Sequence, residues 1–302
     1  MDRLNNMAIF IEVMNGKGFT PAADKLGLSR AQVSKAVMQL EQHLDTRLLN
    51  RTTRRVSPTE IGKIYYERCK TILSDIEEIE NIASQQATSP QGTITISSPT
   101  SFGILQLKDA INQYVKHYPQ MQISLNLADR FVDVVAEGFD LAIRIANLED
   151  SSLIARRLAP CKRVFCASPD YLAKNGQPQA PQDLAIHHCL TYSNDLKPDT
   201  WTLHGPNGSE SVKVNGPLCA NNGDVLKSAA VAGLGITLLP TFIVGPDINA
   251  GRLKPVLTNY CPPDISIHAV FPSRRYLSAK VRTFVDFLSE YFGEIPDWDK
   301  FG

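Results

Sequence analysis

The sequence has few cysteines, and none of them are close together in the chain. Six cysteines are scattered along 302 residues, and no two of them form a CxxC pair. No group of histidines and cysteines has the spacing of a zinc finger. A disulfide framework and a structural zinc site are therefore not expected, and we interpret the cysteines as reduced, mostly buried thiols of a cytosolic protein. We predict no metal and no cofactor.

Signatures of the common catalytic classes are also missing. The sequence has no GxSxG motif, no P-loop and no GxGxxG segment after an expected strand. Among its six histidines, His187 and His188 are adjacent and have no partner at helical spacing. We predict no catalytic residues and no enzymatic activity. An α/β enzyme or a cytoplasmic solute-binding protein remains an alternative.

Long hydrophobic runs are scarce. Residues 228–246 contain no charged residue, but three glycines and Pro240 interrupt them. A buried helix, a glycine turn and a buried strand fit this pattern better than a transmembrane helix. The first residues lead into a short apolar stretch that Glu12 breaks, which is unlike a signal peptide. We expect a cytoplasmic protein without a membrane partner.

An excess of charge of one sign is absent from the whole chain but present in one segment. The formal net charge is zero, with 31 basic and 31 acidic residues. Residues 25–55 contain seven lysines and arginines but only two acidic residues, which gives this segment a charge of +5. Such a concentration in a neutral protein is typical of a modular DNA-binding protein. A solvated basic surface is the alternative.

The N-terminal residues predict three helices. Apolar residues from Leu4 to Met14 recur at helical spacing, and Thr20 followed by Pro21 predicts the start of a second helix. Ser29 and Gln32 have the spacing of a capping box, which predicts the start of the third. In the third helix, one face is apolar and is formed by Val33, Val37, Leu40 and Leu44. Another face is formed by Arg30, Ala31, Ser34, Lys35 and Met38.

Residues 50–56 are compatible with a short hairpin, and Thr59 predicts the start of a long helix to about Gln86. Apolar residues of this helix are four and three positions apart, as in the seam of a coiled coil. They are Tyr65, Cys69, Ile72, Ile76, Ile79 and Ala83. We expect the same helix of a second subunit to cover this seam. Packing on the chain's own C-terminal half is the alternative.

Residues 87–92 have the composition of a hinge, and the pattern then changes to alternating strands and helices. Strands are expected at 93–98, 121–127, 140–145, 164–167, 236–239 and 265–271. Helices are expected at 103–117, 131–137, 226–232 and 279–291. The alternation predicts a mostly parallel α/β sheet.

Residues 19–41 (FTPAADKLGLSRAQVSKAVMQLE) and 47–62 (RLLNRTTRRVSPTEIG) resemble the helix-turn-helix, wing and linker of the LysR-type transcriptional regulators. Residues 137–145, 150–158 and 232–240 (EGFDLAIRI, DSSLIARRL and AGLGITLLP) are similar to one large branch of that family. The resemblance implies a winged helix-turn-helix, a long linker helix and a two-lobed α/β effector domain folded like a periplasmic binding protein. It also implies a homodimer or homotetramer, a promoter site in double-stranded DNA and a small-molecule effector. RNA polymerase is a candidate partner.

We therefore predict three domains. Residues 1–58 form the DNA-binding domain, 59–87 the dimerisation helix and 88–302 the effector domain. Within the effector domain, lobe I is expected at about 93–162 and 268–302, and lobe II at about 163–267.

The third helix is expected to enter the major groove, where a few side chains near its N-terminus read base edges. The resemblance places Arg30, Ala31, Ser34 and Lys35 against DNA, although the family often has Gln-Pro where this chain has Arg30 and Ala31. It also places Arg54 in the minor groove, where arginine suits a narrow, negative groove. Arg51 and Arg55 are expected to contact phosphates or to pair with the linker helix. The predicted DNA-binding set is Ser29, Arg30, Ala31, Gln32, Ser34, Lys35, Arg51, Thr53, Arg54 and Arg55.

The effector is expected in the crevice between the lobes, at the carboxyl ends of the strands. Ser98, Thr100 and Ser101 end the first strand before a helix, which suits an anion, although helix capping alone also explains them. Arg130 and Arg144 are placed to pair an anionic effector, with an ion pair to Asp129 as the alternative. Asn222 is expected on the opposing wall, and Phe242 as an apolar wall.

A different kind of switch is the remaining alternative. A DNA-binding regulator that responds to oxidation of Cys161, Cys166 or another thiol would need no effector.

Overall fold

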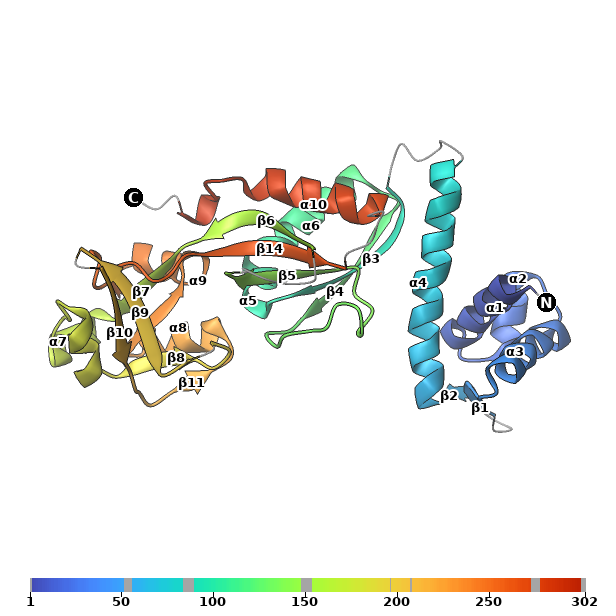
Figure 1. Cartoon of the computed structure of the whole chain (residues 1–302), viewed down its shortest axis with the longest axis horizontal. Coiled ribbons are helices and arrows are strands. Elements are labelled where there is room, and N and C mark those ends of the chain that lie inside the picture. Colours follow the sequence, from blue (N-terminus) through green and yellow to red (C-terminus); the bar gives the residue numbers. More distant parts are fainter. Residues whose placement is uncertain are drawn as a thin grey trace. The chain divides into compact units, whose positions relative to one another are not determined.

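The computed structural model describes residues 2–51, 56–83, 90–147, 154–195, 197–206, 208–272 and 278–299. The chain divides into two units, Met1–Ser89 and Pro90–Gly302. In Figure 1 the first runs from blue to cyan and the second from green to red.

Three helices form the core of the first unit, namely α1 (Arg3–Asn15), α2 (Phe19–Leu26) and α3 (Arg30–Leu44). Their apolar faces meet, and each large aliphatic or aromatic side chain buried this way contributes about 1.5–3 kcal/mol. The buried side chains include Met7, Ile9, Phe10, Val13, Ala22, Ala23, Val33, Val37 and Leu40. The predicted apolar face of α3 is therefore its core face.

The starts of two helices test the local sequence signals. At α3 the predicted capping box is confirmed, because the Ser29 hydroxyl accepts from the Gln32 backbone N–H at 3.2 Å and the Gln32 side chain accepts from the Ser29 N–H at 2.8 Å. At α2 the predicted start at Thr20 is wrong. The helix begins at Phe19, after Gly18, and no side chain caps it. Phe19 packs against the core, which anchors the first turn without a cap.

A short hairpin follows α3. Strands β1 (Leu49–Arg51) and β2 (Val56–Pro58) pair antiparallel, which confirms the predicted hairpin. The carboxylate of Glu41 accepts from the N–H groups of Leu48 and Leu49, at 2.9 and 3.1 Å. These bonds tie the base of the hairpin to the last turns of α3.

Helix α4 (Glu60–Ala83) begins against the same hairpin. The Thr59 hydroxyl accepts from the Gly62 N–H at 2.9 Å and donates to the Arg47 carbonyl at 2.9 Å. A Cβ on Gly62 would lie 1.9 Å from the Leu48 carbonyl oxygen, so only glycine allows α4 to approach β1 this closely.

The predicted seam of α4 is partly wrong. Cys69 is fully buried in the core of the first unit, and the Tyr65 ring lies 5.9 Å from that of Phe10 in α1. These two residues therefore cover the DNA-binding unit and do not face a partner. Ile72, which also belongs to the predicted seam, is 43% exposed, and Ile61 and Ile64 of the same helix are 56% and 65% exposed. The side chains of Ile79 and Ala83 lie outside the described residues.

The second unit contains two five-stranded sheets, which we name lobe I and lobe II. The lobe I sheet has the order β4-β3-β5-β14-β6. Its strands are β3 (Gly92–Ser98), β4 (Met121–Leu127), β5 (Leu141–Ala146), β6 (Ile154–Cys161) and β14 (Ile265–Phe271). Its helical segments are α5 (Thr100–Phe102), the π-helical η1 (Gly103–Leu107), α6 (Lys108–His117), α10 (Ala279–Phe292) and the 3₁₀ turn η3 (Asp297–Asp299).

The lobe II sheet has the order β11-β8-β12-β7-β13. Its strands are β7 (Arg163–Ala167), β8 (Cys189–Tyr192), β11 (Cys219–Ala220), β12 (Ile236–Pro240) and β13 (Lys254–Pro255). A hairpin of β9 (Thr200–Gly205) and β10 (Gly208–Lys213) lies beside it. The helices are α7 (Pro169–Asn175), the 3₁₀ helix η2 (Pro181–Ile186), α8 (Gly223–Val231) and α9 (Thr241–Asn249).

Both sheets are mixed, so the prediction of a mostly parallel sheet is wrong in detail. β3 runs parallel to β4 and β5, but β14 pairs antiparallel with β5 and β6. The chain crosses from β6 to β7 and returns to lobe I at β14, and this returning strand enters its sheet in the opposite direction. The helix expected at 131–137 is also wrong. The Asp133 carboxylate accepts from the N–H groups of Val135 and Ala136 in a turn, and Gly138, at φ +76°, ends it.

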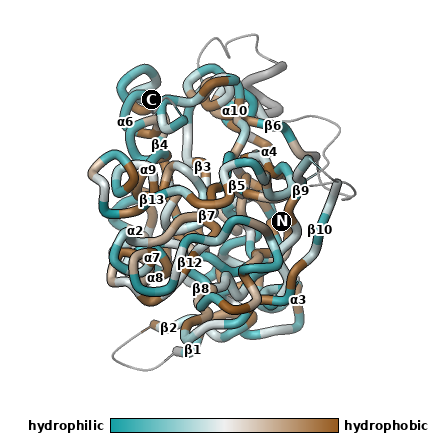
Figure 2. The backbone as a smooth tube through the Cα atoms, turned by 90° about the vertical axis from the view of Figure 1, so that its left-hand side faces the viewer, coloured by the Kyte–Doolittle hydropathy of each residue, from teal (hydrophilic) through white to brown (hydrophobic). Residues whose placement is uncertain are grey.

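The two lobes share one apolar core. Phe102 of lobe I and Phe242 of lobe II lie with their ring centroids 5.5 Å apart, and Trp298 lies 6.1 Å from both. Figure 2 colours the backbone by hydropathy, and Cys166 of strand β7 is one of the buried residues of this shared core. The lobes are therefore packed together at one side by buried rings.

Candidate functional site

The second face of α3 is exposed along its N-terminal half. Ser29, Arg30, Ala31, Gln32 and Lys35 are exposed, and Ser34 is half-buried. These residues lie opposite the buried Val33, Val37 and Leu40. The Gln32 side-chain oxygen is engaged in the capping box, so its amide N–H₂ is the part that faces outward contacts. A rigid, capped helix thus presents a cation, a methyl group and hydroxyls on one side.

The hairpin carries the rest of the predicted DNA-binding set. The backbone of Arg51 pairs with Val56 across the strands. Thr53, Arg54 and Arg55 lie outside the described residues. Glu41 of α3 accepts from the N–H groups of Leu48 and Leu49 at the start of β1, and β2 pairs with β1.

In the second unit, the predicted serines and threonine lie where β3 ends and α5 begins. Ser98 is buried, and its hydroxyl is 3.3 Å from the Pro99 carbonyl. The Thr100 backbone N–H donates to Asp129 at 2.9 Å. The Ser101 hydroxyl donates to the carboxylate of Asp224, on α8 of lobe II, at 2.6 Å. Two of these three residues thus meet carboxylates of the chain itself.

Asp129 is the most connected group of the crevice. One of its carboxylate oxygens accepts from Thr100, and the other accepts from the Asn222 amide of lobe II at 2.9 Å. The Asn194 amide, also of lobe II, donates to the Asp129 carbonyl oxygen. Asn222 caps α8 through its own side-chain oxygen, which accepts from the N–H groups of Asp224 and Val225. The predicted wall residue Asn222 therefore faces the predicted strand end.

Asp224 is stabilised as an anion. Burial alone would raise its pKa, but hydrogen bonds from Lys227 and Ser101 outweigh burial, and the pKa lies below its usual value. The Lys227 ammonium is 2.7 Å from the Asp224 carboxylate. The centre of the crevice therefore holds two carboxylates, Asp129 and Asp224, already surrounded by donors.

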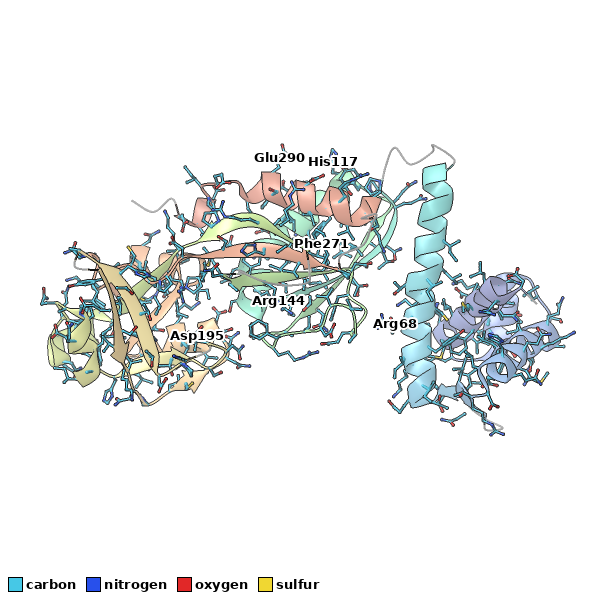
Figure 3. The ribbon with its side chains drawn as sticks, viewed as in Figure 1. Arg68, His117, Arg144, Asp195, Phe271 and Glu290 are labelled. Carbon is cyan, nitrogen blue, oxygen red and sulfur yellow. The ribbon has the colours of Figure 1, made fainter. Side chains whose placement is uncertain are left out.

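The two arginines predicted to bind an anion are engaged elsewhere. Arg130 is 61% exposed and pairs with the carboxylate of Glu137. Arg144 donates to the Val132 carbonyl at 3.0 Å and lies 5.6 Å from the Phe131 ring centroid. Burial lowers the pKa of Arg144. Figure 3 labels Arg144 in lobe I and Asp195 in lobe II.

Phe242 belongs to the shared aromatic core and is 3% exposed. Asp195, which sequence reasoning missed, lies within electrostatic reach of the half-buried Arg163. Desolvation raises the pKa of Asp195, and attraction to Arg163 only partly offsets it. Asn194 was likewise not predicted as a site residue, and Asp129 was expected only as an ion-pair partner of Arg130 or Arg144. The position of Asp129 directly after β4 was the one local signal that it lies at the strand ends.

The cysteines named for a redox switch are buried. Burial raises the pKa of Cys161 and of Cys166 to about 12. Oxidation proceeds through the thiolate, which such a shift suppresses. Cys219 and Cys261 are exposed thiols.

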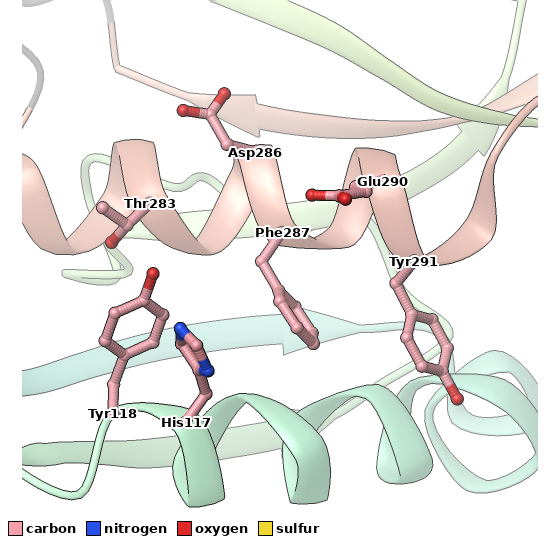
Figure 4. A pocket seen from close by; sticks show the side chains of 7 residues that line it. All are labelled: His117, Tyr118, Thr283, Asp286, Phe287, Glu290 and Tyr291. Atoms are coloured by element: carbon pink, nitrogen blue, oxygen red, sulfur yellow. The ribbon is translucent and has the colours of Figure 1, made fainter.

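A hollow of about 500 Å³ lies away from the crevice, between α6 and α10 of lobe I. Figure 4 shows His117 and Tyr118 at the end of α6 facing Thr283 and Phe287 of α10. Glu290 and Asp286 lie at its edge. The crevice is the better candidate for an effector site, because the two lobes meet there and polar side chains from both lobes lie close together.

Within the described part of the chain, no helix is both long and apolar enough to cross a membrane. The described side chains also include no group of three or more histidine, cysteine, aspartate or glutamate residues arranged to hold a metal ion.

Comparisons with known proteins match most of the chain. Residues 4–63 match the bacterial regulatory helix-turn-helix protein, lysR family, and residues 87–293 match the LysR substrate binding domain. An uncharacterised HTH-type transcriptional regulator of Haemophilus influenzae is 41% identical over 93% of this chain and 98% of its own length.

The HTH-type transcriptional regulator DmlR of Escherichia coli is 39% identical over 96% of this chain and 95% of its own. Among solved structures, CrgA, a LysR-type transcriptional regulator from Neisseria meningitidis, is 32% identical, with a TM-score of 0.60 over 95% of this chain and 97% of that one. The chain belongs to the LysR-type transcriptional regulators, DNA-binding proteins with an effector-binding domain.

Proposed function

We propose that the protein binds promoter DNA by placing the N-terminal half of α3 in the major groove and the β1–β2 loop against the minor groove. The observation that carries this proposal is the exposed face of α3, formed by Arg30, Ala31, Ser34 and Lys35 opposite its buried face. Arg30 and Ala31 reach base edges, where arginine donates to guanine and alanine contacts a thymine methyl. Ser34 and Lys35 bind phosphates.

Arg54 of the loop enters the minor groove in this proposal, and Arg51 and Arg55 contact the backbone on either side. Thr53, which lies between Arg51 and Arg54 in the sequence, contacts DNA beside them in this proposal. Ser29 and Gln32 hold the helix N-terminus and contribute a hydroxyl and an amide. The protein acts on DNA in the cytoplasm and, in this proposal, catalyses no reaction.

We propose that the protein is a homodimer through α4, with a tetramer as the larger assembly. Ile61, Ile64 and Ile72 support this, because three exposed isoleucines on one helix favour a second apolar surface. Ile64→Glu combined with Ile72→Glu is expected to convert the dimer to monomers, measured by sedimentation. An unchanged mass would reject this interface. Such a monomer is also expected to bind a two-half-site operator at least tenfold more weakly.

We propose that a small molecule binds between the lobes and modulates DNA binding or transcription, with RNA polymerase as the contact in the second case. Ser98, Thr100, Ser101, Arg144 and Asn222 form the proposed binding set. Arg130 lies at the exposed rim, and Phe242 contributes through the core behind the site. The donors of this set suit a ligand that carries an anionic group.

The effector is tested on the full chain by thermal shift, against amino acids, aromatic acids, short carboxylates and sugars. A ligand of the native state raises the apparent stability with its concentration. We expect one class to do so saturably, and Thr100→Ala and Arg144→Ala to weaken it. If these variants keep the same concentration dependence as the parent chain, the ligand binds outside the crevice.

Selection from random duplexes tests DNA recognition directly. The full chain is expected to enrich a palindromic sequence. Recovery of no preferred sequence, with the chain folded by circular dichroism, would contradict the proposed function.

A further inference from the structure

The crevice of this chain is closed by its own side chains. The lobes are joined by two passages of the chain, from β6 to β7 and from β13 to β14, so rotation about these passages would open or close the space between them. On the side of the buried rings, Phe102 and Phe242 hold the lobes together. On the crevice side, hydrogen bonds join the two lobes at the strand ends.

Three hydrogen bonds make this polar contact. Asn222 of lobe II donates to the Asp129 carboxylate, and Asn194 of lobe II donates to the Asp129 carbonyl oxygen. Ser101 of lobe I donates to Asp224 of lobe II. Asp129 is central, because its second carboxylate oxygen is held by the Thr100 N–H of its own lobe.

The orientation of the Asn222 side-chain amide is fixed, so Asn222 is the donor and Asp129 the acceptor of their hydrogen bond. The Asn222 side-chain oxygen caps α8 by accepting from Asp224 and Val225, which leaves its N–H₂ group toward Asp129. Asp129 therefore has to be an acceptor at this point, and an asparagine there would place two N–H₂ groups face to face. Exchanging the two residues would restore the pair, since an aspartate at 222 still caps the helix.

We propose that Asp129 is an internal latch of the effector crevice. It bridges Thr100 of lobe I and Asn222 of lobe II, with the Ser101–Asp224 bond beside it, and holds the lobes closed in the absence of effector. The donors that a ligand would use are those that Asp129 and Asp224 occupy. Binding of an effector at these donors therefore releases Asp129 and couples occupancy to the lobe angle. The coupling rests on the proposed function, whereas the latch itself is a property of the ligand-free chain.

Distances between the lobes test the latch without DNA or effector. The background is the full chain with the exposed thiols removed by Cys219→Ser and Cys261→Ser. Spin labels are attached at Gln113→Cys on α6 and Lys174→Cys on α7, which are exposed positions of lobe I and lobe II. Labelled chains are diluted with unlabelled ones, so that pairs within one chain dominate the pulsed-EPR signal.

The parent is expected to give one narrow distance distribution. Asp129→Asn, which keeps the acceptor for Thr100, and Asn222→Asp, which opposes two carboxylates, are each expected to broaden and shift it. The double variant Asp129→Asn/Asn222→Asp is expected to restore the parent distribution. Asp109→Asn, an exposed carboxylate of the same lobe, is the matched control and should leave it unchanged.

An Asp129→Asn distribution identical to that of the parent would overturn the proposal, as would a double variant that stays open. A single variant that fails to fold leaves the double variant as the deciding measurement, because it retains every hydrogen bond of the pair. Failure of the proposed function is distinguishable. If the proposed function is wrong, the parent chain does not bind operator DNA, and this result is independent of the distances between the spin labels.

Discussion

The polar side chains of α3 and those of the interlobe crevice are engaged in different ways. On α3, Arg30 and Lys35 are exposed on a helix whose opposite face is fully buried. In the crevice, Ser101, Asp129 and Asn222 are bonded to partners of the chain itself. A surface that binds a repetitive polyanion can be rigid and preformed, whereas a site that senses a ligand gains from internal contacts that the ligand exchanges. Substitutions on the exposed face of α3 should therefore change DNA binding and leave the stability of the fold unchanged. Substitutions in the crevice should change the stability of the fold and leave DNA binding unchanged.

The largest effect is expected at Gly62, where the DNA-binding surface depends on the backbone. Gly62→Val places a side chain against the Leu48 carbonyl, which a Cβ alone would approach to 1.9 Å. Overpacking of this kind costs about 1–3 kcal/mol or more, and moving the hairpin should abolish operator binding. Thermal unfolding and a DNA-binding titration measure both effects.

Gly18→Ala is the control, since its nearest contact outside the chain neighbours is 3.4 Å from the new Cβ. It should cost less than about 1 kcal/mol. A Gly62→Val chain that melts and binds DNA like the parent would show that the approach of α4 to β1 is not required.

Arg30→Ala is expected to relax the base preference at one position of each half-site. Loss of a bidentate arginine contact costs about 1–3 kcal/mol at that position. Thermal stability should change by less than about 0.5 kcal/mol, because the residue is exposed. Selection from random duplexes provides the readout, and a selected sequence identical to that of the parent would remove Arg30 from base recognition.

Ser101→Ala is expected to show the opposite behaviour. It leaves Asp224 without one donor, and a hydrogen bond to a charged group of this partly exposed kind contributes about 1–2 kcal/mol. Affinity for operator DNA in the absence of effector should be unchanged within about twofold. The comparison fails if Ser101→Ala lowers DNA affinity as strongly as Arg30→Ala while leaving the melting temperature unchanged.

The smallest effect concerns His187 in lobe II. The Tyr171 hydroxyl accepts from the His188 N–H and lies 3.1 Å from His187 Nδ1, within hydrogen-bond distance. Burial lowers the pKa of His187, so the unfolded chain binds a proton more readily than the folded chain. The stability that the lowered pKa of His187 gives to the fold is fully present above the usual pKa of histidine. It is lost as the pH falls from that usual pKa toward the lowered pKa of the folded chain.

Melting temperatures between pH 8 and pH 5, at about half-unit steps, should fall on the acid side, and His187→Gln should flatten that slope. His117→Gln, at an exposed position of α6, should leave the slope as it is. Equal slopes for the parent and His187→Gln would remove His187 from the acid response.

Local signals predicted the four helices of the first unit and, in the second, strands β3, β4, β5, β7, β12 and β14, but they did not predict β6, β8 to β11, β13, α7 or α9. The Ser29–Gln32 capping box, the edges of β4 (Met121–Leu127) and those of β14 (Ile265–Phe271) follow from spacings within one element. The start of α2 and the turn at 131–137 were predicted wrongly, because core packing of Phe19 and side-chain bonds of Asp133 outweigh local propensity.

The exposed face of α3 could be predicted for the same reason, since the helical period of 3.6 residues places it opposite the core face. The crevice could not. Ser101 and Asp224 are 123 positions apart, and Asp129 and Asn222 are 93 apart. Only the packed lobes bring them together, so the sequence indicated donors for a ligand and did not show that internal carboxylates already accept from them. Likewise, Tyr65 and Cys69 fit a coiled-coil seam by spacing but pack on α1.

The measurement that tests the central claim most directly is the salt dependence of affinity for operator and for unrelated DNA, with the parent chain, Lys35→Ala and Arg54→Ala. If α3 and the hairpin loop bind phosphates as proposed, each substitution weakens binding to both DNAs alike. It also reduces the slope of log affinity against log salt by about one unit. Slopes and affinities equal to those of the parent for both variants would contradict the placement of α3 and the loop on DNA.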